Sequence, residues 1–170
     1  DGRMFDAALY RRTLDRVADE APDFYLMLGD DFSTERLIAR GRTTQAAVDA
    51  VYASQPRYLG PLAASTPLFL VNGNHEEAAR FLIDGTTDNP AVLAARARVR
   101  HYALPAPDRF YSGDEIPEPH VGLLRDYYAW TWGDALFVVI DPYWHSVGPF
   151  DIAGASSASS AAGTTRPPES

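Results

Sequence analysis

Two short apolar runs, each ending in glycine and polar residues, stand out in the pattern of this chain. Residues 24–28 read FYLML and lead into Gly-Asp-Asp, and residues 68–71 read LFLV and lead into Asn-Gly-Asn-His-Glu. Apolar runs of this length that end at a turn signal are typical of buried strands. Ligands of open α/β sheets bind at the carboxyl edge of such strands, so the polar residues after both runs are candidates for chemistry.

Helical spacing fills the segments before and between the two runs. Up to Ala21, apolar residues recur at intervals of three and four, and Pro22 ends the pattern. Residues 32–36 predict a loop or a capped helical turn, and a second amphipathic helix follows with Thr43 or Thr44 as its cap. A helix between two apolar strands predicts a βαβ unit with a parallel strand pair. The stretch before the second strand is expected to be broken at Pro56, Gly60, Pro61 and Pro67.

The pattern after the second run is less regular. Residues 77–82 predict a short helix packed against the strand edge, and residues 91–101 predict another helix. Residues 105–119 are rich in Pro, Gly and Asp, which indicates an ordered loop over the sheet edge.

A hairpin is predicted near the end of the apolar part of the chain. Gly133 and Asp134 separate two apolar segments, residues 127–132 and 135–140, as a two-residue turn would. The second segment contains Phe-Val-Val-Ile, which predicts another buried strand that ends at Asp141.

The chain divides into one domain and a tail. Residues 1–148 are long enough to bury a core, whereas residues 149–170 are almost entirely Ala, Ser, Gly, Thr and Pro. Such a composition cannot bury enough apolar surface to order itself, so we expect a disordered tail.

Charge and composition limit the kinds of binding partner that this chain can have. The formal net charge of −8 argues against nucleic acid as the main partner, because phosphate backbones need Lys and Arg. There is no cysteine, so any metal ion must be held by oxygen and nitrogen ligands. No apolar run approaches the length of a membrane span. The compartment stays open, with a cytoplasmic and an exported protein both compatible with the sequence.

The two strand ends carry three candidate site residues. Asp30 offers a carboxylate that could bridge two cations, Asn74 a neutral amide oxygen, and His75 an imidazole that can hold or donate a proton. Structural alternatives are a turn-capping Asp30, a turn-forming Asn74 and an exposed His75. Asp31 is expected to be a solvated loop carboxylate. Glu76 is expected to set the local fold or to support the metal ligands from behind, with no chemistry of its own.

Two motif blocks resemble the calcineurin-like (binuclear) metallophosphoesterases. That family shows D-x-H, G-D, G-N-H-[DE], a lone His and G-H-x-H in order; residues 29–30 match the second block and residues 73–76 the third. The first, fourth and fifth blocks are absent from this chain. Residues 7–36, 57–76 and 126–145 are also similar to a bacterial branch of purple-acid-phosphatase-like architecture.

The resemblance implies a fold and a mechanism. It implies an α/β fold, a partial metallophosphoesterase sandwich of βαβ units with a mixed sheet, truncated at both ends. In the complete protein, two divalent or trivalent metal ions such as Mn, Fe or Zn would be held in part by Asp30 and Asn74. A metal-bridging hydroxide would then hydrolyse a phosphomonoester or phosphodiester substrate, with His75 assisting the leaving group. With two retained ligands, the chain alone is expected to have little or no activity.

The remaining histidines are assigned no chemistry. His101 is expected on a solvated basic helix face with Arg96, Arg98 and Arg100. His120 falls in a Pro-flanked loop, and His145 lies too close to the preceding strand to match the fourth block. A ligand role is open for Asp141 at its strand end, although the family pattern gives it none.

Three other functions compete with this one. A nuclease of the same superfamily is disfavoured by the acidic balance. A non-catalytic fragment or interaction module of the same fold would keep the turns without the chemistry. A nucleotide-binding α/β domain is discounted, because no glycine-rich phosphate loop follows a strand.

Overall fold

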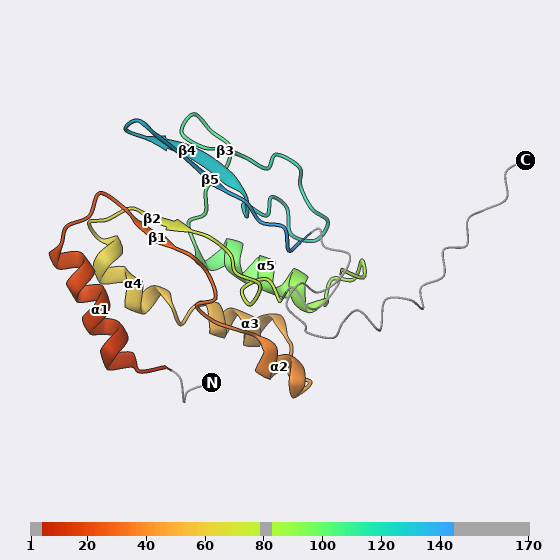
Figure 1. Cartoon of the computed structure of the whole chain (residues 1–170). Helices are drawn as coiled ribbons and strands as arrows, with labels where there is room; N and C mark the ends of the chain where they lie inside the picture. Colours follow the sequence, from red (N-terminus) through yellow and green to blue (C-terminus); the bar gives the residue numbers. More distant parts are fainter. Residues whose placement is uncertain (1–4, 79–82, 145–170) are drawn as a thin grey trace, which may run out of the picture.

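The computed structural model describes residues 5–78 and 83–144, which form a mixed α/β fold with two sheets (Figure 1). The elements, in chain order, are α1 (Ala7–Asp19), β1 (Tyr25–Met27), α2 (Glu35–Ala39), α3 (Gln45–Tyr52), α4 (Pro56–Ala63), β2 (Leu68–Leu70), α5 (Pro90–His101), β3 (Ser112–Gly113), β4 (Tyr128–Trp132) and β5 (Ala135–Val139). The predicted α/β class is confirmed, with its parallel and antiparallel strands in separate sheets.

The two motif-bearing strands form the predicted parallel pair. β1 and β2 are aligned so that Tyr25 lies opposite Leu68 and Met27 opposite Leu70. Because the strands are parallel and in register, both of their carboxyl ends lie at the same edge. The connection between them contains three helices, α2 to α4, where the sequence predicted one clear helix.

The predicted break before β2 is wrong, because α4 runs through that stretch. Pro56 occupies the first turn of the helix, where its missing N–H costs nothing. Pro61 removes one intrahelical hydrogen bond, but Leu59 and Leu62 on the same helix are buried. Tertiary burial of this apolar face therefore outweighs the low helix propensity of the prolines.

The parallel pair has a different covering on each face. Leu68 and Leu70 of β2 pack with Met27, toward the cluster formed by Leu14 of α1 and the buried leucines of α4. Phe69 points the other way and stacks on Trp130 of β4, with ring centroids 4.0 Å apart. Helices thus cover one face and the three-stranded sheet covers the other, as Figure 1 shows.

Two helix predictions hold in detail. The side chain of Thr44 accepts a hydrogen bond from the N–H of Ala47 and caps α3, and the side chain of Asp6 caps α1. α3 packs on α5 through Val48 and Tyr52, against the small residues of α5. The predicted helix at residues 91–101 corresponds to α5.

The hairpin is confirmed, but its second strand is only half buried. Gly133, with φ of 58°, is the first of two turn residues between β4 and β5, as a type II′ turn requires. In β5, Val139 is buried, whereas Leu136 and Val138 are exposed. β5 is an edge strand of the order β3-β4-β5, so one of its faces lacks a covering layer among the described residues.

The remaining expectations are met in part. The loop of residues 105–119 contains the two-residue strand β3, which pairs with β4 at the sheet edge. Residues 77–78 lie in a turn, and the rest of the helix predicted at 77–82 lies outside the described residues, as do His145 and the predicted tail. In the described part of the chain, no helix is long and apolar enough to cross a membrane.

Candidate functional site

The turns that follow β1 and β2 are packed directly against each other. Gly29 has φ of +91° and Asp30 has φ of +59°, so the chain reverses sharply after β1. A Cβ atom on Gly29 would lie 2.2 Å from the backbone nitrogen of Gly73, and a Cβ atom on Gly73 would lie 2.1 Å from Oδ1 of Asp30. Both positions require glycine, because a side chain at either one would push the two turns apart.

The carboxylate of Glu76 holds the two turns together. It accepts hydrogen bonds from the backbone N–H groups of Asp30 (2.6 Å), Asp31 (2.5 Å) and Gly73 (2.8 Å). The Tyr52 hydroxyl of α3 donates to the carbonyl oxygen of Glu76. Glu76 therefore sets the local fold, as the sequence predicted, by satisfying backbone donors that would otherwise be orphaned.

The structure brings the three predicted site residues to one edge. Asp30 is exposed, while Asn74 and His75 are half-buried. The backbone N–H of His75 donates to Oδ1 of Asp30 at 3.3 Å, and Nδ1 of the His75 ring lies 3.4 Å from a carboxylate oxygen of Glu35. The three residues thus lie in the turns where the parallel strands end, and their roles stay predictions.

The donor set of this edge fits a hard metal ion. Asp30, an exposed residue, offers a carboxylate oxygen, and Asn74 offers a neutral amide oxygen. These two side chains make only part of a coordination sphere, since hard cations take six or more ligands.

Asp31 lies at an exposed loop position, as expected, but its carboxylate interacts with neighbouring acids. The residue is exposed as a whole. Partial burial of its carboxylate, followed by repulsion from Glu76 and Asp30, raises the pKa of Asp31 to about 6. Three acidic side chains, those of Asp30, Asp31 and Glu76, therefore interact at the edge of the parallel pair.

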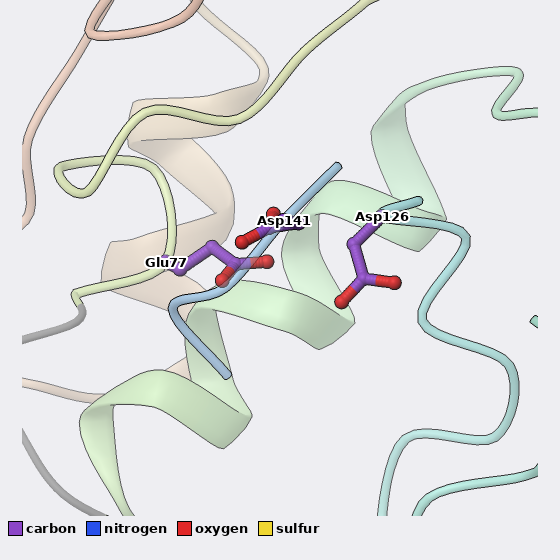
Figure 2. Close-up of side chains that lie close together, drawn as sticks. All are labelled: Glu77, Asp126 and Asp141. Carbon is purple, nitrogen blue, oxygen red and sulfur yellow. The ribbon is translucent and has the colours of Figure 1, made fainter. Parts of the chain in front are cut away.

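A second acidic group lies next to this edge. Glu77, Asp126 and Asp141 each offer a carboxylate oxygen within 4.8 Å of the others, and all three residues are buried (Figure 2). The side-chain amide of Asn72 donates to Glu77 at 2.6 Å and to Asp141 at 2.9 Å. We call these three carboxylates the acidic cluster.

Burial controls the protonation of the acidic cluster. Burial and then repulsion from Asp141 raise the pKa of Asp126 to about 6. The same two causes raise the pKa of Glu77 well above its ordinary value, and burial also raises that of Asp141. Arg98 acts in the opposite direction on all three groups.

Sequence reasoning missed most of the acidic cluster. Glu77 and Asp126 were given no role, and a ligand role was left open only for Asp141, at its strand end. One signal was available, because a hairpin with its turn at residues 133–134 pairs Tyr128 with Val139. The same register places residue 126 opposite residue 141, so two acidic residues meet beyond the hairpin's open end.

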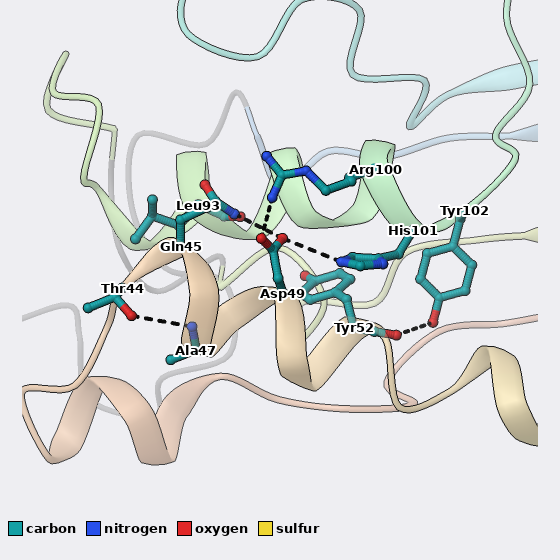
Figure 3. Close-up of polar contacts among 9 residues, drawn as sticks. All are labelled: Thr44, Gln45, Ala47, Asp49, Tyr52, Leu93, Arg100, His101 and Tyr102. Atoms are coloured by element: carbon teal, nitrogen blue, oxygen red, sulfur yellow. Dashed lines mark hydrogen bonds and ion pairs between the residues drawn. The ribbon is translucent and has the colours of Figure 1, made fainter.

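The solvated basic face expected on α5 is wrong for its central arginine. Arg98 is only 5% exposed and donates to the carbonyl oxygen of Arg125 at 3.2 Å. At the end of the helix, Arg100 forms an ion pair with Asp49, and the Nε2 atom of His101 lies 3.5 Å from the same carboxylate (Figure 3). α5 therefore uses its basic residues to hold neighbouring segments.

Two cavities lie near these groups. A cavity of about 20 Å³, roughly the size of one water molecule, is bordered by Asp31, Asn72, Glu76 and Arg98 among others. It lies between the motif turns and the guanidinium of α5. A larger, mainly apolar cavity of about 320 Å³ lies between α4, β2 and the end of α5, and none of the three predicted site residues lines it.

Comparison with known proteins identifies the family. A sequence model of the calcineurin-like phosphoesterases matches residues 5–144, which is most of the chain. The comparisons with curated proteins and with solved structures gave no match. The match spans both strand-end motifs as well as the acidic cluster. The chain therefore belongs to the calcineurin-like phosphoesterase family.

Proposed function

We propose that this chain contributes part of the active site of a metal-dependent hydrolase that cleaves phosphomonoesters or phosphodiesters. The observation that carries the proposal is the pair of interlocked turns, which bring Asp30, Asn74 and His75 to one edge of the parallel strands. The family membership gives the reaction class. Similarity of residues 7–36, 57–76 and 126–145 supports the finer assignment to a bacterial purple-acid-phosphatase-like branch.

Each residue has a distinct role in this proposal. Asp30 and Asn74 would hold metal ions, which supply charge to the phosphoryl oxygens and acidify water. His75 is half-buried beside Asp30, so its imidazole can hold or donate a proton to the leaving oxygen of a bound ester. A carboxylate oxygen of Glu35 lies 3.4 Å from Nδ1 of the ring and can orient it.

The proposal includes low activity of the isolated chain. Neither D-x-H nor G-H-x-H occurs in its sequence, so only Asp30 and Asn74 match the ligand positions of the resembled pattern. Two ligands cannot hold a binuclear centre tightly. The competing function, a non-catalytic interaction module of the same fold, rests on this same shortage of ligands.

The test compares two proteins on two substrates. The isolated chain, and a protein that carries it together with the two missing motifs, are assayed with Mn²⁺ on p-nitrophenyl phosphate and bis-p-nitrophenyl phosphate. We expect turnover only in the second, with kcat reduced by about 10²–10⁴ for His75→Asn. Asp30→Ala is expected to reduce it at least as much, because a metal ligand is lost.

The matched control is Glu115→Gln, which removes a carboxylate from an exposed loop position and is expected to leave kcat unchanged. Full activity of His75→Asn and Asp30→Ala would contradict the proposed roles. Inactivity of the second protein on both esters would favour the interaction module.

A further inference from the structure

We propose that the acidic cluster of Glu77, Asp126 and Asp141 is a second cation site, separate from the motif turns, that takes one hard divalent ion of the Ca²⁺ kind. Its three ligands come from three segments, namely the turn after β2, the segment before β4 and the segment after β5. None of them is Asp30 or Asn74, so this site does not depend on the proposed function.

The spacing of the oxygens suits such an ion. Carboxylate oxygens of the three residues lie within 4.8 Å of one another, and Figure 2 shows the side chains converging from different segments. An ion at 2.3–2.6 Å from each ligand separates opposite oxygens by about 4.6–5.2 Å, the range of calcium coordination. Only oxygen donors are present in the cluster, which favours Ca²⁺, Mg²⁺ or Mn²⁺ over softer metals.

Buried atoms without partners point to something bound between them. Oε2 of Glu77 and Oδ2 of Asp126 are fully buried and accept no hydrogen bond within the described part of the chain. Leaving such groups unsatisfied costs free energy, and more so for charged groups. A cation between them would satisfy both oxygens at once.

Arg98 lies near the acidic cluster but does not satisfy its free oxygens. This buried side chain faces all three carboxylates electrostatically, yet its Nη2 atom has no hydrogen-bond partner among the described residues. Its Nη1 atom instead donates to the backbone carbonyl of Arg125. Among the described residues, Arg98 therefore does not donate to the free oxygens of Glu77 and Asp126.

The net charge of the acidic cluster and Arg98 indicates the valence of the proposed ion. Three ionised carboxylates and one guanidinium sum to −2, and a buried net charge of this size is strongly unfavourable. One divalent cation neutralises it. Protons are the alternative counter-charge, and the raised pKa values of the cluster describe that cation-free state.

The proposed ion would tie the motif edge to the second sheet. Glu77 directly follows Glu76, which holds the two motif turns, and Asp126 and Asp141 flank the β4–β5 hairpin. An ion shared by these segments would fix the hairpin against the turn after β2. We therefore expect cation binding to stabilise the fold as a whole.

The experiment measures cation-dependent stability and binding in the 170-residue chain. Thermal unfolding is followed at pH 7.5 in chelator and then in millimolar Ca²⁺, with calorimetric titration of Ca²⁺ alongside. We expect one ion per chain and a rise in Tm of at least about 3 °C. Asp126→Asn and Asp141→Asn should weaken Ca²⁺ binding about tenfold or more, because ligand charge sets affinity.

Two control variants distinguish the acidic cluster from the motif turns and from buried carboxylates in general. Asp114→Asn changes a buried carboxylate outside the cluster, and Asp30→Ala removes the motif ligand. Both are expected to keep the Ca²⁺ response, so failure of the proposed function would leave this result unchanged. Far-UV circular dichroism checks that each variant folds.

Two outcomes would overturn the proposal. The first is a wild-type chain whose Tm and heat of titration do not respond to Ca²⁺, Mg²⁺ or Mn²⁺, which would mean that protons neutralise the cluster. The second is a Ca²⁺ response that is equal in wild type and Asp126→Asn, which would place the ion elsewhere.

Discussion

Glu76 and Glu77 are neighbours in the sequence and are both buried, at 5% and 3% exposure, yet they meet opposite surroundings. The Glu76 carboxylate receives backbone N–H groups from both motif turns. The Glu77 carboxylate faces two further carboxylates, with the Asn72 amide as its one hydrogen-bond donor among the described residues. Burial alone therefore does not determine the electrostatic environment of a buried carboxylate. Its neighbours decide whether it meets hydrogen-bond donors or other acids.

The difference follows from backbone geometry. Consecutive residues of a turn point in different directions, so Glu76 reaches the turn amides while Glu77 reaches the open end of the hairpin. One carboxylate organises the motif edge, and its neighbour contributes to a group that needs a counter-charge. Four substitutions test this contrast.

Glu76→Ala should cause the largest loss of stability. It leaves several backbone N–H groups of the two turns without an acceptor, and hydrogen bonds to a charged group contribute about 1.5–3 kcal/mol each. We expect the free energy of unfolding to fall by about 4 kcal/mol or more, measured by urea denaturation. Glu115→Ala, at an exposed position, should change it by less than about 0.5 kcal/mol, and a similarly small effect of Glu76→Ala would refute the role of this carboxylate.

Gly73→Ala should separate the two turns. Its Cβ would overlap Oδ1 of Asp30 at 2.1 Å, and no rearrangement of the Asp30 side chain avoids the backbone behind it. We expect a loss of about 2–4 kcal/mol in the same denaturation measurement. Gly60→Ala is the matched control, because its Cβ meets nothing within 4 Å in helix α4, and it should stabilise the chain by about 0.5–1 kcal/mol. Equal effects of the two substitutions would contradict the interlocked turns.

Asp126→Asn should flatten the pH dependence of stability in chelator-treated buffer. The pKa of Asp126 is raised from 3.8 to about 6 by burial and by Asp141, with Glu77 and Arg98 also facing it. The folded state then keeps a proton that the unfolded state has released, so this contribution to stability is complete below about pH 4 and is lost as the pH rises through 6.

The rise in the pKa of Asp126 from 3.8 to about 6 corresponds to a change of about 3 kcal/mol at most in the free energy of unfolding. Between about pH 4.5 and pH 7.5, we expect the free energy of unfolding of wild type to fall by about 2 kcal/mol more than that of Asp126→Asn. Urea denaturation across that pH range measures both proteins. Parallel curves for the two proteins would show that the Asp126 carboxyl is not destabilised by its neighbours.

Tyr52→Phe should have the smallest effect of the four. It removes the hydroxyl that donates to the carbonyl of Glu76 and leaves the ring packed against Phe32. The buried carbonyl loses its donor, at a cost of about 1–2 kcal/mol. An unchanged free energy of unfolding would mean that α3 does not support the motif turn through this contact.

The sequence predicted those parts of the fold that local pattern determines. The helix up to residue 21, the Thr44 cap, the two motif strands and the Gly133-Asp134 turn all depend on short-range spacing, and all were found. α4 was missed because prolines read as breaks, whereas burial of Leu59 and Leu62 decides the outcome. β5 read as fully buried, but composition does not reveal that one face of an edge strand lacks a cover.

The residues of the candidate site likewise fall into two groups, those that a local motif predicts and those that depend on the tertiary fold. Asp30, Asn74 and His75 were predicted from motif blocks, because the residues that matter lie within a few positions of each strand end. The acidic cluster joins residues 77, 126 and 141, so it depends on tertiary pairing between distant segments. Arg98 was misread for the same reason, since a helical spacing does not say which neighbour covers a face.

The interlocked turns are expected to form one cation-facing edge. The most direct test is an NMR titration of the ¹⁵N-labelled Asp126→Asn chain, whose acidic cluster is weakened, with substoichiometric Mn²⁺, in which amide signals near the bound ion broaden. We predict broadening at residues 29–31 and 73–75 in this variant, and its loss when Asp30→Ala is added to it. Broadening that leaves both turns untouched, or that persists after Asp30→Ala is added, would contradict the cation-facing edge.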